Sequence, residues 1–253
     1  LVYLSGKNLN FSLGGRINNH QTYGNFFTYS LNPSYNFNFK ESQNIKIFAT
    51  LNSAFIAPSL YQLYDSYSGN ENLLPEESIS KEVGIETINK KRNFSIVFFE
   101  RKENPKIIYE YNFSTFTGGY INTPSDLIFR GIEIDYSKVF FDKMDFSFNY
   151  TFNELKKGTL QRLPKHSFNE SITYNFKRNR QLSFIYRYRG KREATGGSEI
   201  LNSYGLMDTR FSFTKYKINF NFWVNNVFNK EYVEILNYSS KGRNLRLGIT
   251  YEF

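Results

Sequence analysis

The sequence lacks cysteine and contains only two histidines, His20 and His166, among its 253 residues. Disulfide bridges and thiolate metal sites are therefore excluded. Two histidines are also too few for most histidine-based metal centres or catalytic sites. No run of about 18 consecutive apolar residues occurs, so no transmembrane helix is expected. We therefore expect no resident metal or cofactor, and a catalytic role is weighed below against the residues available for it.

The formal net charge is +9, a balance for which nucleic-acid binding is the first interpretation to test. The lysines and arginines are scattered over turns, loops and strand interiors, and they form no compact basic helix or stripe. We therefore expect no nucleic-acid partner.

Alternation of apolar and polar residues dominates the chain. In the stretch 144–153, Met, Phe, Phe, Tyr and Phe alternate with Asp, Ser, Asn, Thr and Asn. Such a period of two predicts a β-strand with one apolar and one polar face. The same pattern predicts thirteen strands near 1–4, 8–18, 25–38, 44–55, 79–89, 93–102, 125–139, 144–154, 167–176, 180–189, 204–214, 218–227 and 244–253.

Short and long connections between these strands alternate without a break. The short ones fall at 5–7, 40–43, 90–92, 141–143, 177–179 and 216–217, and the long ones at 19–24, 56–78, 103–124, 155–166, 190–203 and 228–243. This alternation is typical of outer-membrane barrels, which have short periplasmic turns and longer extracellular loops. The chain is therefore predicted to be all-β, a transmembrane antiparallel β-barrel whose last strand ends in the periplasm.

A soluble β-sandwich is the alternative fold. It is disfavoured because the polar faces are rich in Asn, Ser and Thr, as the wall of a wet lumen would be. Phenylalanine and tyrosine, 27 and 20 residues, also concentrate near strand ends, as aromatic girdles do.

Three segments resemble TonB-dependent outer-membrane receptors. The first is Ala54–Tyr64 (AFIAPSLYQLY) together with Asn70–Glu86, which contains NENLLPEES and EVGIE. The second is Arg130–Ile134 (RGIEI). The third is Trp223–Tyr232 (WVNNVFNKEY), which continues through Gly242-Arg243 to Tyr251-Glu252-Phe253. The resemblance runs in order along the whole chain. It implies a barrel of about 22 strands with a plugged lumen, of which residues 1–253 form the C-terminal portion, roughly 13 strands.

The resemblance also implies partners. These are the lipid of the outer membrane, a large nutrient ligand, and the TonB complex, which such receptors contact through an N-terminal region. The family's plug and energy-coupling box have no counterpart in these residues, and the first residues do not form a signal peptide. A longer or processed protein is therefore expected. The terminal Phe253 resembles the signal by which such barrels are recognised for membrane insertion.

The expected function is uptake of a scarce nutrient, either cobalamin or a ferric siderophore. The resemblance disfavours haem, because haem receptors of that family carry a histidine between the two corresponding motifs, and none lies between Pro58 and Pro75. Aromatic side chains in loops above a lumen suit a large, partly apolar ligand. The candidate ligand-binding residues are Tyr61, Tyr64, Tyr67, Tyr109, Tyr111, Arg192 and Tyr238.

Three other functions remain open for such a barrel. A passive porin-like channel would need no plug, and an adhesive barrel would bind host or phage surfaces through its loops. A barrel lipase would need a geometric triad, for which His166, Ser167 and Asp208 are the available residues. Adjacency in sequence does not supply that geometry, so catalysis is not expected.

Overall fold

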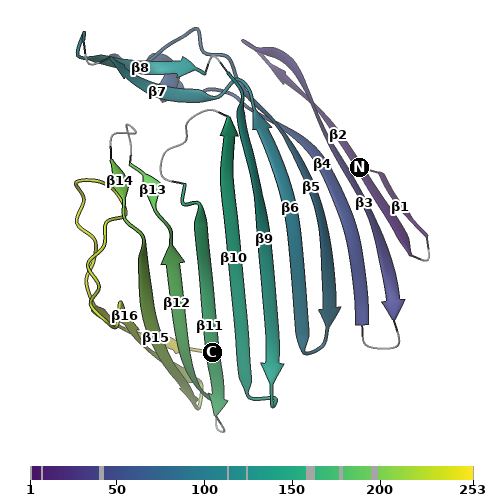
Figure 1. Ribbon diagram of the computed structural model, residues 1–253, viewed down its shortest axis with the longest axis vertical. Helices are drawn as coiled ribbons and strands as arrows, with labels where there is room; N and C mark the ends of the chain where they lie inside the picture. Colours follow the sequence, from purple (N-terminus) through teal and green to yellow (C-terminus); the bar gives the residue numbers. More distant parts are fainter. Residues whose placement is uncertain are drawn as a thin grey trace.

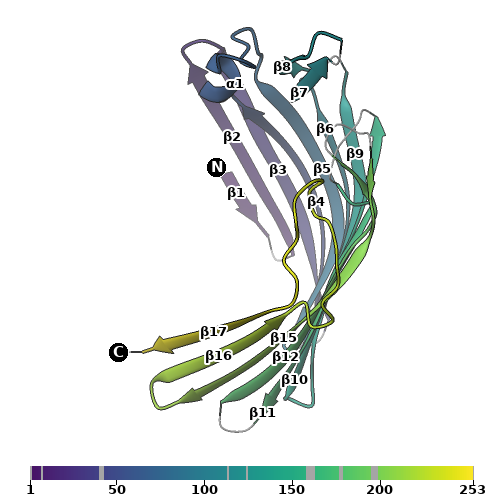
Figure 2. The same ribbon diagram turned by 90° about the vertical axis from the view of Figure 1, so that its left-hand side faces the viewer.

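The computed structural model describes residues 2–6, 8–39, 43–112, 114–123, 125–157, 163–176, 179–194 and 199–252. Over these residues, thirteen strands form one antiparallel sheet that curves into a trough-shaped wall (Figures 1 and 2). No helix in the described ranges is long and apolar enough to cross a membrane.

The strands of this sheet lie in chain order, so each interior strand pairs with the preceding and following members of the sheet, and β1 and β17 form its edges. Its strands are β1 (Val2–Ser5), β2 (Leu9–His20), β3 (Gly24–Phe39), β4 (Gln43–Ile56), β5 (Glu76–Asn89), β6 (Arg92–Glu103), β9 (Leu127–Phe140), β10 (Met144–Lys157), β11 (His166–Phe176), β12 (Arg180–Arg189), β15 (Tyr204–Lys215), β16 (Ile218–Asn225) and β17 (Asn244–Tyr251). The thirteen strands predicted from alternation are confirmed, with ends that differ by up to a few residues.

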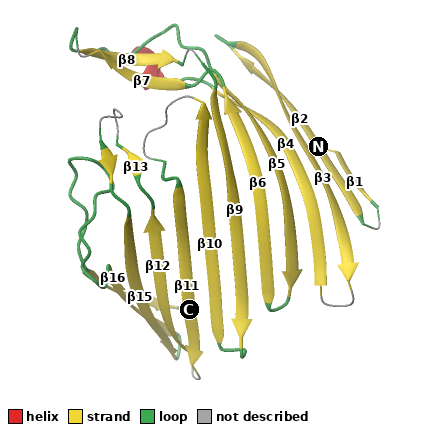
Figure 3. Cartoon of the chain, in the orientation of Figure 1, coloured by secondary structure: helices red, strands yellow, loops and turns green. Residues whose placement is uncertain are grey.

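The connections divide the sheet into two ends (Figure 3). Short turns such as 90–91, 141–143 and 216–217 lie at one end, here called the turn end. The segments 57–75, 104–126 and 226–243 lie at the other, here called the loop end. The loop end carries a short helix α1 (Leu60–Tyr64), a hairpin of β7 (Ile107–Asn112) and β8 (Thr117–Asn122), and a small pair of β13 (Arg192–Glu193) and β14 (Ile200–Leu201).

Two predicted boundaries were wrong for local reasons. The link expected at 19–24 is a three-residue turn, because β2 and β3 stay paired as far as His20 and Gly24. Strand β16 ends at Asn225, two residues earlier than expected. The next residue, Asn226, has a positive φ of 50° and exchanges hydrogen bonds of 2.8 and 2.9 Å with the main chain of Lys230. This side chain closes a turn where alternation predicted more strand.

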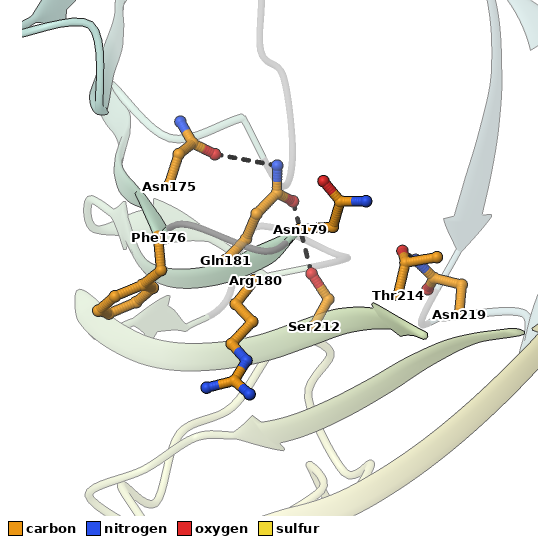
Figure 4. Close-up of a pocket in the computed structure, with 8 residues that line it drawn as sticks. All are labelled: Asn175, Phe176, Asn179, Arg180, Gln181, Ser212, Thr214 and Asn219. Atoms are coloured by element: carbon orange, nitrogen blue, oxygen red, sulfur yellow. Dashed lines mark hydrogen bonds between the residues drawn. The ribbon is translucent and has the colours of Figure 1, made fainter. Parts of the chain in front are cut away.

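The sheet has one polar and one apolar face. On the polar face, hydroxyl groups pair between strands, for example Ser147 with Ser171 at 2.7 Å and Thr173 with Ser183 at 2.8 Å. Near the turn end this face forms a pocket of about 410 Å³ (Figure 4), in which Gln181 donates to Asn175 at 3.0 Å and accepts from Ser212 at 3.4 Å. Because the inner face of an outer-membrane barrel is polar, we expect this polar face to be the concave one that lines the lumen.

Two glycines permit close packing on this polar face. A Cβ atom on Gly131 would collide with the main-chain oxygen of Phe152 and with the ring of Phe99. One on Gly84 would lie 2.6 Å from the ring of Phe48. Neither glycine has a positive φ, so the need for glycine comes from space rather than from backbone conformation.

Candidate functional site

The segment between β4 and β5 begins with a well-capped helical turn. Strand β4 ends before Pro58, which cannot donate to a sheet ladder. Ser59 then accepts a hydrogen bond of 3.2 Å from the Gln62 N–H, and the Gln62 side chain accepts one of 2.8 Å from the Ser59 N–H. This reciprocal capping satisfies the first free N–H groups of α1. It fixes the direction in which Tyr61 and Tyr64 leave the chain.

Asp65 shapes the turn that follows α1. Its carboxylate accepts hydrogen bonds from the Ser68 hydroxyl at 2.6 Å, the Ser68 N–H at 3.0 Å and the Tyr67 N–H at 3.3 Å. The hydrogen bond from the Ser68 hydroxyl is the main reason that the pKa of Asp65 lies below its ordinary value. The turn therefore holds Tyr67 in a fixed place while leaving its side chain 94% exposed.

The β7–β8 hairpin packs against this segment through four hydrogen bonds, which we call the loop frame. The Tyr120 N–H donates to the Ser68 carbonyl at 3.0 Å, and the Asn70 amide donates to the Tyr120 carbonyl at 2.9 Å. Asn122 accepts from the Leu74 N–H at 2.8 Å and donates to the Leu74 carbonyl at 2.9 Å. Two distant segments thus become one rigid unit.

Three tyrosines meet where the two segments join. Tyr120 makes edge-to-face contacts with Tyr61, at a ring separation of 6.1 Å, and with Tyr109, at 5.4 Å. Burial raises the pKa of Tyr120, with further contributions from Tyr61, Asp65 and Tyr109. Tyr61 and Tyr109 remain exposed, and the three rings form an aromatic surface that we call the tyrosine cluster.

An ion-pair network holds the base of the hairpin. Lys106 lies 3.0 Å from Glu76 and 3.3 Å from Glu103, whose side chain is buried. Glu76 also accepts a hydrogen bond of 2.9 Å from the Ile107 N–H. Burial alone would lower the pKa of Lys106, but the two carboxylates outweigh it and raise the pKa above the ordinary value of 10.5. Beside the network lies a pocket of about 360 Å³ that also reaches Phe99 and Phe129 on the polar face.

The raised pKa of Lys106 gives a pH-dependent prediction. Because the folded pKa lies above the unfolded one, the stabilisation is fully present below pH 10.5 and is lost as pH rises through the folded value. Proteolysis within residues 107–122 should therefore be constant from neutral pH to about pH 9 and increase above about 10.5.

The variant Lys106→Met supplies the comparison. It leaves the buried carboxylate of Glu103 without this cation, so cleavage of the hairpin should be several-fold faster even at neutral pH. Cleavage of Lys106→Met at the wild-type rate would show that the network does not hold the hairpin.

A second group of loops is fixed by Arg192. Its side chain is buried and donates hydrogen bonds to the carbonyls of Val233 and Glu234 at 3.0 and 3.1 Å. The Arg192 guanidinium also lies over the ring of Tyr204. The Tyr204 hydroxyl donates to Glu234 at 3.0 Å. These contacts tie the segment 226–243 to β13 and β15. Tyr238, from the same segment, remains exposed.

The structure therefore places the candidate residues in two groups. Tyr61 and Tyr109 meet through Tyr120, and Tyr67 stands at the turn beside them. Tyr64 lies near Tyr23. The pKa of Tyr23 is raised mainly by burial and further by this neighbouring Tyr64. Tyr111 lies farther along β7, while Arg192 and Tyr238 belong to the second group of loops. Phe253 lies outside the described residues.

The sequence missed Tyr120, Asn70 and Asn122, which build the frame and the cluster. Residues 103–124 were predicted to be a loop, whereas 107–112 and 117–122 form a hairpin. The alternation of Ile107, Tyr109 and Tyr111 was a signal for β7. Gly118 and Gly119 obscured β8, because glycine is rare in strands.

No catalytic or metal-binding constellation appears in the described ranges. His166 accepts or donates a 2.9 Å hydrogen bond with the Tyr150 hydroxyl on the apolar face, while the adjacent Ser167 points to the opposite face. Asp208 is engaged by Arg187 at 2.5 Å. Among the residues that the structure describes, no three His, Asp or Glu side chains gather as a metal site.

Residues 2–227 match the family described as TonB dependent receptor-like, beta-barrel. The chain belongs to the TonB-dependent receptor family. The resemblance noted in the sequence is thereby confirmed. Among curated relatives, this receptor chain is 28% identical to the vitamin B12 transporter BtuB of Vibrio cholerae serotype O1, over 94% of the chain and 39% of the relative. The chain thus spans about two fifths of the length of that relative.

Solved structures confirm the barrel fold of this receptor chain. The siderophore receptor PirA of Acinetobacter baumannii superposes with a TM-score of 0.78 at 19% identity, covering 98% of this chain and 44% of PirA. The copper transporter OprC gives a TM-score of 0.80 at 13% identity, covering 98% and 46%. At these identities the similarity shows the fold alone. The all-β sheet described above is therefore part of a TonB-dependent receptor barrel.

Proposed function

We propose that this chain is the C-terminal portion of the barrel of an outer-membrane receptor that imports a scarce, large nutrient with energy from the TonB system. In this proposal the loop end faces the outside of the cell, the turn end faces the periplasm and the apolar face contacts lipid. The observation that carries it is the tyrosine cluster, an exposed aromatic surface held on the hydrogen-bonded loop frame. A fixed aromatic surface favours specific capture of a ligand, because little ordering entropy is lost on binding.

Cobalamin is the favoured ligand, ahead of a ferric siderophore. A surface of tyrosine rings with exposed hydroxyl edges suits a large ligand that has apolar faces and polar groups. The name of the 28%-identical relative, a vitamin B12 transporter, supports the same choice. The proposed contact residues are Tyr61, Tyr64, Tyr67, Tyr109, Tyr111 and Tyr238. The buried position of Arg192 favours a role in holding the loop that presents Tyr238.

Uptake into cells tests this function. The full-length receptor, expressed in a strain that lacks its own cobalamin and siderophore receptors, should accumulate labelled cobalamin only when TonB is present. Labelled ferric siderophores tested in the same cells would reveal the second ligand class. Uptake that persists without TonB would instead indicate a passive channel. Retention of the receptor in the outer membrane with no uptake of either ligand would favour an adhesive barrel.

A further inference from the structure

The short turns carry most of the net charge of the chain. The six connections 5–7, 40–43, 90–92, 141–143, 177–179 and 216–217 contain nine lysines and arginines but only two carboxylates. The remaining residues contribute +2 to the formal net charge of +9. These cations are scattered in the sequence, but the fold gathers the described turns at one end of the wall (Figure 1).

The resulting basic edge, which we call the turn rim, presents its charges to solvent. Its described turn cations, all with exposed side chains, are Lys90, Lys91, Arg92, Lys143 and Lys217. Lys91 lies 2.7 Å from Asp142 in the neighbouring turn. Among the described residues, Lys90, Lys143 and Lys217 take part in no ion pair. The charge of these three lysines is therefore available to a partner.

A repeated main-chain contact holds the turn rim in place. In four turns, the carbonyl of a turn residue accepts a hydrogen bond from an N–H of the next strand of the sheet or of the residue that follows that strand. The donor and acceptor residues are Val139 and Lys91, Asn175 and Lys143, Thr214 and Asn179, and Glu252 and Lys217, at 2.8, 2.7, 3.0 and 2.8 Å. Because these bonds use main-chain groups, they fix the turns without engaging the lysine side chains.

The spacing of the turns suits a polymer. Successive turns of the rim lie two strands apart, which is about 10 Å. Cations that far apart meet successive charges along an extended chain more readily than they converge on one phosphate group. A chain with carboxylates at intervals therefore fits the turn rim better than a single lipid headgroup does.

A pocket of hydrogen-bonding groups opens at the same rim. It has a volume of about 410 Å³, and its lining includes the turn residue Asn179 (Figure 4). The neutral amide and hydroxyl side chains of its other polar residues belong to Asn175, Gln181, Ser212, Thr214 and Asn219. Amides and hydroxyls both donate and accept hydrogen bonds, so they suit the hydroxyl and acetamido groups of sugars. The pocket and the cations together favour a sugar polymer that carries carboxylates.

We propose that the turn rim binds the cell-wall polymer of the periplasm, whose sugars carry hydroxyl and acetamido groups and whose side branches carry carboxylates. The rim lysines pair with the carboxylates, and the pocket beside Asn179 receives a sugar. The inference rests on the proposed function, since it takes the turn end to face the periplasm. Such binding would hold the receptor beside the wall layer.

Sedimentation with purified sacculi, the insoluble cell wall freed of protein, tests the binding. Full-length receptor in detergent is mixed with sacculi, the suspension is centrifuged, and the receptor in the pellet is measured. The triple variant Lys90→Glu, Lys143→Glu, Lys217→Glu should bind about tenfold more weakly, because three exposed attractive charges become repulsive.

Two controls isolate the turn rim and the carboxylates. The variant Lys191→Glu, Lys230→Glu, Lys241→Glu changes the net charge equally with exposed lysines of the loop end, and it should bind as the wild type does. Sacculi whose carboxylates have been converted to neutral amides should bind the wild type about tenfold more weakly. A Lys→Gln version of the triple variant, checked for its folded band on unheated gels, guards against misfolding and should also bind more weakly.

Several outcomes would overturn the proposal. These are unchanged binding of the triple variant, equal loss in the loop-end control, and unchanged binding to the amidated sacculi. Loss of bound phosphatidylglycerol in the triple variant, with unchanged sedimentation, would assign the turn rim to lipid instead. Nutrient uptake is measured separately. Receptor that imports nutrient but does not sediment with sacculi would refute this inference alone, and receptor that sediments but imports nothing would refute the proposed function alone.

Discussion

Replacing Gly131 by alanine is expected to deprive the receptor of most of its folded barrel. The new Cβ would collide with the main-chain oxygen of Phe152, which is held in the β9–β10 ladder, and with the Phe99 ring on the other side. Side-chain relaxation cannot relieve the contact with the backbone. Overpacking of this kind costs about 1–3 kcal/mol, and here the strand pairing itself must shift.

The measurement is the folded fraction of full-length receptor in outer-membrane extracts, read from its mobility on unheated gels. Gly119→Ala is the matched control, because a Cβ there would meet its nearest neighbour, the Ser68 carbonyl, at 3.5 Å. The control should fold like the wild type. Normal folding of Gly131→Ala would mean that the wall is not packed as tightly as described.

The double variant Tyr61→Ala, Tyr109→Ala should bind its nutrient at least tenfold more weakly, because tyrosines at the centre of a binding surface often contribute about 2 kcal/mol each. The two rings pack on Tyr120 but do not take part in the loop frame through their side chains. The frame should therefore survive, and the loss should appear in ligand affinity rather than in folding.

Equilibrium binding of labelled cobalamin to purified full-length receptor gives the affinity. Tyr216→Ala is a suitable control, since Tyr216 is also highly exposed but lies in the turn between β15 and β16. It should bind as the wild type does. Unchanged affinity in the double variant would remove the tyrosine cluster from the ligand site, and equal loss in Tyr216→Ala would indicate a nonspecific effect.

The wall of the receptor could be predicted from the sequence because its information is local. In β10, the alternation from Met144 to Asn153 identifies both the strand and its two faces, and the paired residues on β9 and β11 show the same pattern. Register then follows from matching like faces across short turns. The family motifs then indicated which class of outer-membrane barrel the chain belongs to.

The loop frame could not be predicted in this way, because its contacts join residues far apart in the chain. Asn122 bonds to Leu74 across 48 residues, and nothing in the residues around either one indicates the other. The five-residue helix α1 is too short to show a helical period. Arg192 illustrates the same limit. The sequence offered it as a candidate ligand-binding residue, whereas its burial depends on carbonyls about forty residues away.

The loop frame is built from main-chain groups and the side chains of Asn70 and Asn122, and none of its four hydrogen bonds uses a tyrosine hydroxyl. The scaffold and the contact surface can therefore diverge independently. Substitutions at Tyr61, Tyr67 or Tyr109 could redirect the receptor to another cargo while Asn70 and Asn122 keep the same geometry. For receptor engineering, this makes the three tyrosines the positions to randomise and the two asparagines the positions to hold constant.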